Sequence, residues 1–433
     1  MTDTWEVEPS GPLSGDVEVA GSKNAVTKHM VAALLSNEPS TIANVPDVGD
    51  VAITASILTS LGVGVERNNG AVTIDPSGPI DSEVSVEYTG LNRISILLLG
   101  PLLYRSGEAF VPMPGGDKIG RRPIDFHVAA LRAFGAEVEE TETGVLARAH
   151  RLTGARIDLP YPSVMATEAV LITASLAEGR TVLTGAATEP EILELALFLQ
   201  RMGARIQRQP GRRFVIDGVE RMHGATRALA GDRLEAFSYL VAGLISGGQV
   251  RVKGCPQAAL TTALTTLQAM GAEIRITDEY VAAEQRRPLG AVAIHTDTHP
   301  GFATDWQSPM LVLMTQAYGM SVLHETVFED RVRYPAQVID AMGGEIEMFA
   351  TCLGGPDCRF ADRNAKHSVV VRGVSKLVGT EVEIPDVRAG FSGVIAASVA
   401  DGLSRISGVR HLERGYDNPF DRLSSLGLTL RRV

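Results

Sequence analysis

The chain has 433 residues, 45% of them hydrophobic and only 5% aromatic, and a formal net charge of −11 at pH 7. This length exceeds one ordinary core and predicts two domains of roughly 200 residues each. The negative charge argues against nucleic acid as a partner. The longest nearly uninterrupted apolar run, Ile94 to Tyr104, is 11 residues, too short to span a bilayer. With no secretory signal at the start, we expect a cytoplasmic protein that does not bind membranes.

The cysteines indicate a reducing compartment. Cys255, Cys352 and Cys358 are odd in number and sparse, which argues against a disulfide framework. Cys352 and Cys358 lie near His367, but their spacing matches no common zinc pattern. We therefore expect no metal and no other cofactor.

Along the chain, one unit recurs six times. A helix-like segment runs into a strand through a Leu, Met or Phe followed by Gly, with the glycines at Gly62, Gly135, Gly203, Gly271, Gly343 and Gly427. Their spacings are 73, 68, 68, 72 and 84 residues. The longest spacing has a visible cause, because residues 349–366, rich in Gly, Pro, Asp and Arg, interrupt the fifth repeat. We interpret this stretch as a surface insertion.

Each repeat also contains a helix that is apolar on nearly every side, as buried helices are. In chain order these are "NAVTKHMVAALLS", "RISILLLGPLLY", "ATEAVLITASLAE", "RLEAFSYLVAGLIS", "WQSPMLVLMTQAY" and "AGFSGVIAASVAD". The short strands that follow carry β-branched residues beside turn formers. The pattern predicts an α/β fold with three repeats per domain, sheets outside and buried helices inside. We expect one domain at residues 1–22 plus 231–433 and the other at 23–230.

Equivalent strand-to-helix turns are expected to face one region. They hold Lys23-Asn24, Arg93, Ser163, Asp232-Arg233, Thr304-Asp305 and Asp386-Arg388, and a second set of helix starts holds Arg122, Arg331 and Arg414. A helix N-terminus offers unpaired N–H groups and a partial positive charge, to which Lys or Arg adds full charge. Taken singly, each Arg could be a solvated surface group and each Asp or Ser an N-cap. Jointly, they predict a cleft for a highly anionic ligand.

At these residues the sequence resembles a known family. The stretches "GSKNAVTKHMVAALLS", "PGGDKIGRRPIDFH", "PSVMATE", "PGFATDWQ", "ETVFEDR", "DVRAG" and "ERGYDN" look like the UDP-N-acetylglucosamine 1-carboxyvinyltransferases, the enolpyruvyl transferases that begin peptidoglycan synthesis. The resemblance covers nearly the whole chain in order. It implies two inside-out α/β prism domains of three repeats each, with the chain crossing twice. The related shikimate-pathway transferase is set aside, because its Gly-Asn-Ala-Gly-Thr stretch is absent where "TGLNRIS" stands.

The resemblance also implies roles for individual residues. Asp305 resembles the base that takes the proton from the sugar 3-hydroxyl. The phosphoenolpyruvate-binding positions are Lys23, Asn24, Arg122 and Arg414, with Arg331 and Arg388 as further cleft cations. The positions that hold the UDP-sugar are Arg93, Pro123, Ile124, Asp125, Phe126, His127, Ser163, Val164, Met165 and Val327. Thr304 and Asp386, at the repeated turns, complete the expected substrate-binding set.

The chain departs from the family on the loop at residues 112–121, which we expect to act as a lid. The family usually has Cys where this chain has Asp117, so we expect Asp117 to reach the enolpyruvyl carbon as proton donor. A free aspartate ionises near pH ~3.9 and a free cysteine near ~8.5, so we expect a more acidic pH optimum. A carboxylate is also a poorer nucleophile toward epoxides, which predicts resistance to fosfomycin, the epoxide that alkylates the family's cysteine.

A second departure concerns the acceptor. Met165 stands where the family normally has Gly, and Tyr161 where many members have Lys. Met165 could crowd the diphosphate or sugar, or it could simply face the core. Three readings stay open: transfer of enolpyruvyl from phosphoenolpyruvate to UDP-N-acetylglucosamine, transfer to another acceptor such as a nucleotide, and a catalytically silent regulator that binds UDP-sugar. The partners expected are these small molecules, with the chain a monomer or weak homo-oligomer.

Overall fold

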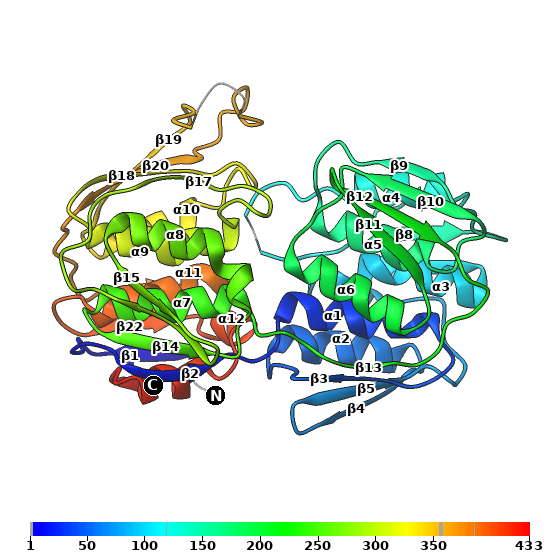
Figure 1. Cartoon of the computed structure of the whole chain (residues 1–433), viewed down its shortest axis with the longest axis horizontal. Coiled ribbons are helices and arrows are strands. Elements are labelled where there is room, and N and C mark those ends of the chain that lie inside the picture. The colour runs from blue at the N-terminus through cyan, green and yellow to red at the C-terminus, as the bar shows by residue number, and fades with distance from the viewer. Residues whose placement is uncertain (1–2, 118, 355–357, 385) are drawn as a thin grey trace. The chain divides into compact units, whose positions relative to one another are not determined.

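The computed structural model describes residues 3–117, 119–354, 358–384 and 386–433, and it divides the chain into two compact units (Figure 1). The first unit comprises Met1–Ala20, Asp117–Arg121 and Gly231–Val433, and the second comprises Gly21–Gly116 and Arg122–Ala230. Each unit has its own apolar core. Compared with the expected division, the first boundary lies two residues earlier, and Asp117–Arg121 is grouped with the first unit rather than with the rest of its loop.

Three sheets surround buried helices in the described part of the first unit. The inner helices α7 (Arg233–Ile245), α9 (Gln307–Thr315) and α11 (Val387–Ser398) are buried along their whole length. The sheets have the orders β21-β22-β1-β23, β15-β16-β14-β2 and β17-β18-β20-β19. Their strands are β1 (Thr4–Val7), β2 (Gly15–Glu18), β14 (Gln249–Lys253), β15 (Glu273–Ile276), β16 (Tyr280–Glu284), β17 (Ala293–His295), β18 (Gly319–His324), β19 (Glu345–Phe349), β20 (Ser368–Gly373), β21 (Glu381–Glu383), β22 (Ser404–Ser407) and β23 (Leu430–Arg432). The other helices are α8 (Thr261–Met270), α10 (Arg333–Ala341), α12 (Arg410–Glu413) and α13 (Pro419–Ser425).

The described residues of the second unit repeat this plan. The sheet orders are β13-β3-β5-β4, β11-β12-β10-β9 and β6-β8-β7. The strands are β3 (Ser40–Ala43), β4 (Gly64–Asn68), β5 (Ala71–Asp75), β6 (Glu108–Pro112), β7 (Glu137–Glu140), β8 (Gly144–Arg148), β9 (Arg156–Asp158), β10 (Arg180–Thr184), β11 (Arg205–Gln209), β12 (Arg213–Asp217) and β13 (Thr226–Ala228). The helices are α1 (Lys23–Ala32), α2 (Gly49–Ser60), α3 (Leu99–Ser106), α4 (Asp125–Ala133), α5 (Val164–Ala174) and α6 (Pro190–Arg201). The expected inside-out α/β architecture is confirmed.

The repeated glycines have a conformational cause. The second helix of every repeat ends just before one of them, and all six, Gly62, Gly135, Gly203, Gly271, Gly343 and Gly427, have φ between 79° and 106°. This left-handed conformation satisfies the last carbonyls of a helix and strains any residue with a Cβ. The glycine that recurs six times in the sequence therefore marks six helix C-termini of the same conformation.

The pairing of parallel strands explains why the chain crosses between the units after Ala20 and again after Ala230, apart from the short segment Asp117–Arg121. In a regular repeat, the strands on either side of a buried helix pair in parallel, as β9 and β10 do around α5 and β17 and β18 do around α9. At α1 and α7 the partners are exchanged, because β2 pairs with β14 and β13 pairs with β3. The chain thus leaves the first unit after Ala20 and returns after Ala230.

The insertion joins β19 to β20 in the first unit. The corresponding strands β4 and β5 are joined by two residues, 69 and 70, whereas β19 and β20 are separated by residues 350–367. Most described residues of the insertion are exposed or half-buried, as a surface insertion should be, but Phe360 is fully buried. Residues 355–357 lie outside the described residues.

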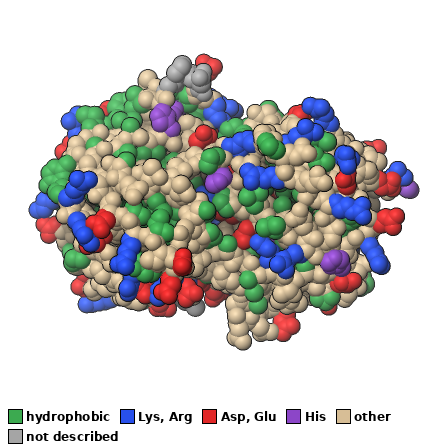
Figure 2. Space-filling view, viewed as in Figure 1, with side chains coloured by type: hydrophobic (Ala, Val, Ile, Leu, Met, Phe, Trp, Pro, Cys, Tyr) green, Lys and Arg blue, Asp and Glu red, His purple; other side chains and the backbone are tan. Residues whose placement is uncertain are grey.

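The surface shows no large patch of one charge on the visible face, where acidic and basic side chains are interspersed (Figure 2). No helix in the described ranges combines the length and apolar character needed to cross a bilayer.

Candidate active site

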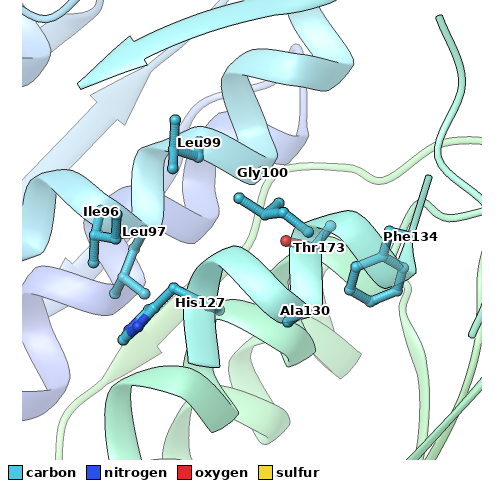
Figure 3. Close-up of a pocket in the computed structure, with 10 residues that line it drawn as sticks. Ile96, Leu97, Leu99, Gly100, His127, Ala130, Phe134 and Thr173 are labelled. Atoms are coloured by element: carbon cyan, nitrogen blue, oxygen red, sulfur yellow. The ribbon is translucent and has the colours of Figure 1, made fainter. Parts of the chain in front are cut away.

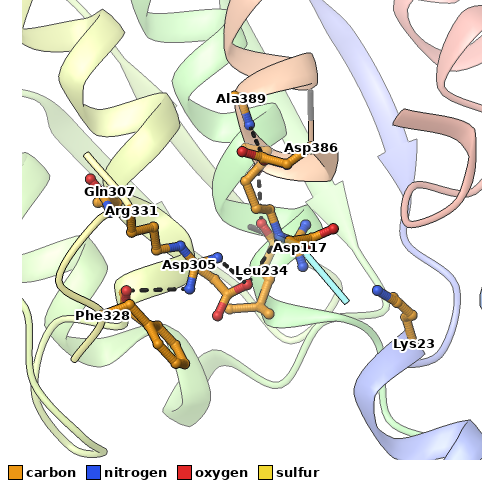
Figure 4. Close-up of polar contacts among 12 residues, drawn as sticks. Lys23, Asp117, Leu234, Asp305, Gln307, Phe328, Arg331, Asp386 and Ala389 are labelled. Carbon is orange, nitrogen blue, oxygen red and sulfur yellow. Dashed lines mark hydrogen bonds and ion pairs between the residues drawn. The ribbon is translucent and has the colours of Figure 1, made fainter. Parts of the chain in front are cut away.

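In the first unit, Asp305 contacts two buried arginines, Arg331 (Figure 4) and Arg388. Its Oδ1 accepts hydrogen bonds from Nη2 of Arg331 at 3.0 Å and from Nε of Arg388 at 3.3 Å. The arginine side chains are only 7% and 6% exposed, whereas that of Asp305 is 28% exposed. Asp305 is therefore the member of this triad that solvent, or a substrate, can reach.

The two arginines determine the ionisation of Asp305. Burial alone would raise the pKa of Asp305, but the charges of Arg331 and Arg388, and the hydrogen bond from Arg331, outweigh it and hold this pKa below its usual range. Opposite charges within a few ångströms act in this direction because they favour the ionised carboxylate. Asp305 is thus a carboxylate at neutral pH.

Local structure positions the triad. Asp305 lies in the 3₁₀ turn Thr304–Trp306 that leads into α9, and Arg388 lies in the first turn of α11. The guanidinium of Arg388 also lies over the ring of Tyr416, 4.9 Å from its centroid. The Arg388 guanidinium also interacts with the Tyr416 hydroxyl, but its buried Nη1 makes no hydrogen bond of good geometry to the residues that the structure describes. An unpartnered buried guanidinium nitrogen is costly, and an anionic ligand would satisfy it.

Asp386 caps the helix from which Arg388 projects. Its side chain accepts the backbone N–H groups of Arg388 and Ala389 at 2.8 and 2.9 Å, as an N-cap does. The pKa of Asp386 is raised, mainly by burial and also by the negative charge of Asp117. The two backbone hydrogen bonds and the charge of Arg331 oppose this rise but do not cancel it. Asp386 therefore has a structural role in addition to any contact with substrate.

Asp117 belongs to the same unit and is paired with Arg414, whose Nη2 lies 3.3 Å from its Oδ1. Each side chain is 22% exposed. The neighbouring loop residues are also attached to this unit: the N–H of Arg121 donates to Oε1 of Glu329 at 3.1 Å, and the N–H of Asp330 donates to the carbonyl of Ile119 at 3.2 Å. The structure thus places Asp117 and Arg414 together, near Asp386.

A buried carboxylate, Glu325, supports this site. It accepts hydrogen bonds from the Thr304 hydroxyl at 2.9 Å and from the Gln307 amide at 3.1 Å. It also accepts the backbone N–H of Val327 at 2.7 Å, and Nη1 of Arg331 donates to Thr304 at 3.3 Å. Glu325 therefore fixes the turn that carries Asp305 and the segment that carries Arg331.

In the second unit, Lys23 is the first residue of α1 and forms an ion pair with Asp50, in the first turn of α2, at 2.7 Å. The side chains are 15% and 10% exposed. Asn24 follows on α1 and is half-buried. The ion pair joins helices of one repeat, so Lys23 is held at the helix start.

Residues Arg93 and 122–127 form a second group in this unit. Nη2 of Arg93 donates to the Pro123 carbonyl at 2.7 Å. Burial and the nearby charge of Arg122 lower the pKa of Arg93 to about 10, which places two cations close together. Ile124 precedes α4, which begins with Asp125 and Phe126.

His127 of α4 faces the interior. It lines a small, mainly apolar pocket with Leu97, Phe134 and Thr173 (Figure 3). Burial, followed by the charge of Arg93, lowers the pKa of His127 to about 4. His127 is therefore neutral and borders the core.

The segment 163–165 begins α5. Ser163 is its N-cap and accepts the N–H of Ala166 at 3.4 Å, and Val164 follows as the first helical residue. Met165 is half-buried and packs against the apolar core of the second unit. This packing supports the reading in which Met165 faces the core. Tyr161, just before the helix, is also half-buried.

Several residues of these groups were not expected from the sequence to have a role. Asp50, Glu325, Glu329 and Tyr416 are each distant along the chain from the residue that they contact. Asp50 and Tyr416 lie inside stretches that read as ordinary helix or turn. A spacing rule could not find them, because their contacts join different elements.

Comparison with known proteins identifies the family of the whole chain. The EPSP synthase (3-phosphoshikimate 1-carboxyvinyltransferase) family matches residues 7–423. UDP-N-acetylglucosamine 1-carboxyvinyltransferase from Protochlamydia amoebophila is 41% identical over 440 aligned positions, covering 100% of this chain and 94% of that protein. The proteins of the same name from Chlamydia pneumoniae and Desulfovibrio desulfuricans are 42% and 38% identical, covering 97% and 99% of this chain and 93% and 99% of their own.

Solved structures show the same fold. The enolpyruvyl transferase NikO from Streptomyces tendae matches with a TM-score of 0.88 at 23% identity, over 100% of this chain and 99% of its own. EPSP synthase from Acinetobacter baumannii matches with a TM-score of 0.76 at 21% identity, over 99% of each chain. At such identities the likeness extends to the fold alone.

Proposed function

This chain belongs to the UDP-N-acetylglucosamine 1-carboxyvinyltransferases of the EPSP synthase family, and we propose that it transfers the enolpyruvyl group of phosphoenolpyruvate to the 3-hydroxyl of UDP-N-acetylglucosamine. Relatives with that name are about 40% identical over nearly the full chain. The observation that carries the proposal is the ionised Asp305 between two buried arginines. Such a group can accept a hydroxyl proton beside cations that bind an anion.

The proposed reaction is addition followed by elimination. The 3-hydroxyl oxygen bonds to C2 of phosphoenolpyruvate, its proton passes to Asp305, and C3 gains a proton to become a methyl group. C3 then loses a proton, the C2–O bond to phosphate breaks, and inorganic phosphate leaves. Positive charge develops at C2 in both steps, so negative groups and exclusion of water around C2 favour the reaction.

The charged residues divide between the two units. Phosphoenolpyruvate carries a carboxylate and a phosphate on three carbons, which several planar guanidiniums and a lysine suit. We assign Lys23, Asn24, Arg122 and Arg414 to its binding, with Arg331 and Arg388 as further cations. Arg93, the segment 123–126, Ser163, Val164 and Val327 are assigned to the UDP-sugar, with Thr304 and Asp386 supporting the site. His127 and Met165, which were expected in this set, pack toward the core instead.

Asp117 is proposed as the acid that protonates C3. It lies beside Arg414, itself assigned to phosphoenolpyruvate, and near Asp386, and it would have to take up a proton when Arg414 turns from it to the substrate. The loop that carries it would cover the reacting carbon. Because a carboxylate replaces the thiol that fosfomycin alkylates, the enzyme is proposed to resist this epoxide.

The proposed reaction places the enzyme in the cytoplasm, where phosphoenolpyruvate is made, and in peptidoglycan synthesis. It needs no partner chain, so a monomer or weak homo-oligomer would suffice. The half-buried Met165 packs against the core, which favours the acceptor proposed here.

The test is phosphate release from phosphoenolpyruvate with UDP-N-acetylglucosamine, UMP or UDP offered separately. We expect turnover with the sugar nucleotide alone and an enolpyruvyl ether in the product. Release with a bare nucleotide would replace the proposed acceptor. No release with any of them, from protein that binds UDP-N-acetylglucosamine, would indicate a regulator instead.

A further inference from the structure

A cluster of two cysteines and two histidines lies where the insertion meets the sheet of β17 to β20. His324 is the last residue of β18, and His367 immediately precedes β20. Cys352 and Cys358 come from the insertion itself. One ligand atom from each of the four residues lies within 4.8 Å of the others. The histidines are 2% and 0% exposed, and the cysteines are half-buried.

The distances within the cluster fit a tetrahedral metal. Nε2 of His367 lies 3.2 Å from Sγ of Cys352 and 3.4 Å from Sγ of Cys358. Zinc bonds of about 2.3 Å to sulfur and about 2.0 to 2.1 Å to nitrogen, at tetrahedral angles, place S and N ligands about 3.6 Å apart. The protein atoms thus lie close to the ligand positions of such a site.

Both histidine rings are held by their other nitrogen. Nδ1 of His367 lies 2.7 Å from the Ala365 carbonyl, which can only accept, so Nδ1 carries the proton and Nε2 carries the lone pair. Nδ1 of His324 lies 2.7 Å from the Ser368 hydroxyl, which leaves Nε2 of His324 available to a metal. Metal-binding histidines characteristically have such a partner, which fixes the tautomer and the ring orientation.

The backbone supports the thiol side as well. The N–H of Phe360 points at Sγ of Cys358 at 3.4 Å, a contact that stabilises a thiolate. The N–H of Leu353, next to Cys352, donates to the same Ser368 hydroxyl at 3.2 Å. The ring of Phe360 packs edge-on against His367 and shields that side from water.

We propose that His324, Cys352, Cys358 and His367 form a structural zinc site. Two thiolates and two imidazoles in a tetrahedral set favour zinc over harder cations such as magnesium or calcium. All four positions of the tetrahedron are filled by protein, so the site stabilises structure and does not activate water. The sequence alone led us to expect no metal, because the spacing of Cys352, Cys358 and His367 matches no common zinc pattern. The fourth ligand, His324, is distant along the chain, and only the fold brings it to the cysteines.

The zinc site attaches the insertion to the sheet near both ends of the insertion. Without metal, the insertion is a long connection between two adjacent strands. A metal that joins it to β18 and β20 removes much of its conformational freedom. The fastened segment also reaches the loop of Asp117: Nη1 of Arg363 lies 3.4 Å from Oε1 of Glu329, the oxygen that accepts the Arg121 N–H. Zinc therefore positions Arg363 beside that loop.

The first experiment measures metal in the full-length protein. Protein purified in the presence of a thiol reductant, incubated with zinc and dialysed, should retain about one zinc per chain by mass spectrometry of the elements. Replacement by cobalt should give the visible bands of tetrahedral coordination with a thiolate-to-cobalt charge-transfer band. Wild-type protein that retains no zinc and gives no such cobalt spectrum would overturn the proposal, and so would a Cys352–Cys358 disulfide in reductant-purified protein.

Variants test the ligand set. Cys352→Ser, Cys358→Ser and His324→Gln should each lose stoichiometric zinc, and the variants of the cysteines should also lose the charge-transfer intensity. The matched controls are Cys255→Ser, the third cysteine, and His295→Gln, whose ring lies 5.9 Å from that of His324 but outside the cluster. Both should bind like wild type. Equal loss in the controls would refute this ligand set.

Ser368 is a positioning residue whose role can be tested separately. Ser368→Ala should keep the cobalt spectrum but weaken metal affinity about 10- to 100-fold, because the His324 ring loses its hydrogen-bond partner. Unchanged affinity would show that Ser368 does not orient the ring.

Discussion

Replacing Asp305 with Asn tests the triad most directly. The substitution keeps the shape of the side chain but removes the negative charge between Arg331 and Arg388, which lie 3.0 and 3.3 Å away. A positioned general base contributes about 10²- to 10⁴-fold to a rate, so we expect kcat to fall by about that factor. The KM for phosphoenolpyruvate should not rise, because the arginines lose an internal competitor for the anion.

Stability changes for a different reason. Removing one partner of a buried ion pair costs about 3–5 kcal/mol, because the other charge stays buried and unpaired. The side chain of Asp305 is 28% exposed, so water already screens part of its attraction to the arginines, and we expect a loss of about 1–3 kcal/mol. Added phosphoenolpyruvate should restore part of this loss by binding the same arginines.

The assay combines steady-state phosphate release with urea unfolding, with and without phosphoenolpyruvate. The control is Asp401→Asn, which removes a carboxylate from an exposed pair with Lys376 at 3.1 Å and should change neither kcat nor stability. If Asp305→Asn stays folded and its kcat remains within about threefold of wild type, a difference too small for a general base, the assignment of Asp305 is wrong.

Three further predictions concern other residues. Asp117→Cys should become subject to time-dependent inactivation by fosfomycin and should shift the pH optimum upward; a pH–rate profile identical to that of wild type would count against Asp117 as the acid. Burial, opposed by the charge of Lys28, raises the pKa of Glu168 to about 8. Above about pH 4.5 the unfolded chain releases a proton that the folded chain retains. The free energy of unfolding therefore falls as pH rises toward 8. Glu168→Gln should flatten this fall in urea unfolding from about pH 5 to 8, and an unchanged slope would contradict the raised pKa. Gly427→Ala should lower the free energy of unfolding by about 1–2 kcal/mol, because Gly427 has φ of 100°; an added Cβ would have no atom within 4 Å, so no steric clash contributes. The control is Gly11→Ala, a position that is equally open but has no positive φ. Equal unfolding midpoints for the two variants would refute the conformational argument.

The sequence by itself determined the repeats and the fold class. The residue after each of six helices has a left-handed conformation that requires glycine, and a buried helix requires apolar residues on every side. Both features therefore depend only on residues that are close together in the sequence. The predicted helices around Met310 and Phe391 are found as α9 and α11. The exchange of pairing partners between β2 and β13 cannot be predicted from neighbouring residues, because it depends on which distant strand each of them pairs with.

For the site, the sequence placed charged residues at helix starts, where the physics of the helix terminus is local. Only the tertiary structure decided their partners: Asp305 with Arg331 and Arg388, Lys23 with Asp50, and Asp117 with Arg414. It also brought His324 to Cys352 and Cys358 across a β-sheet. Ionisation and metal binding depend on distances of a few ångströms between groups far apart along the chain, and these distances exist only once the sheets and helices have packed.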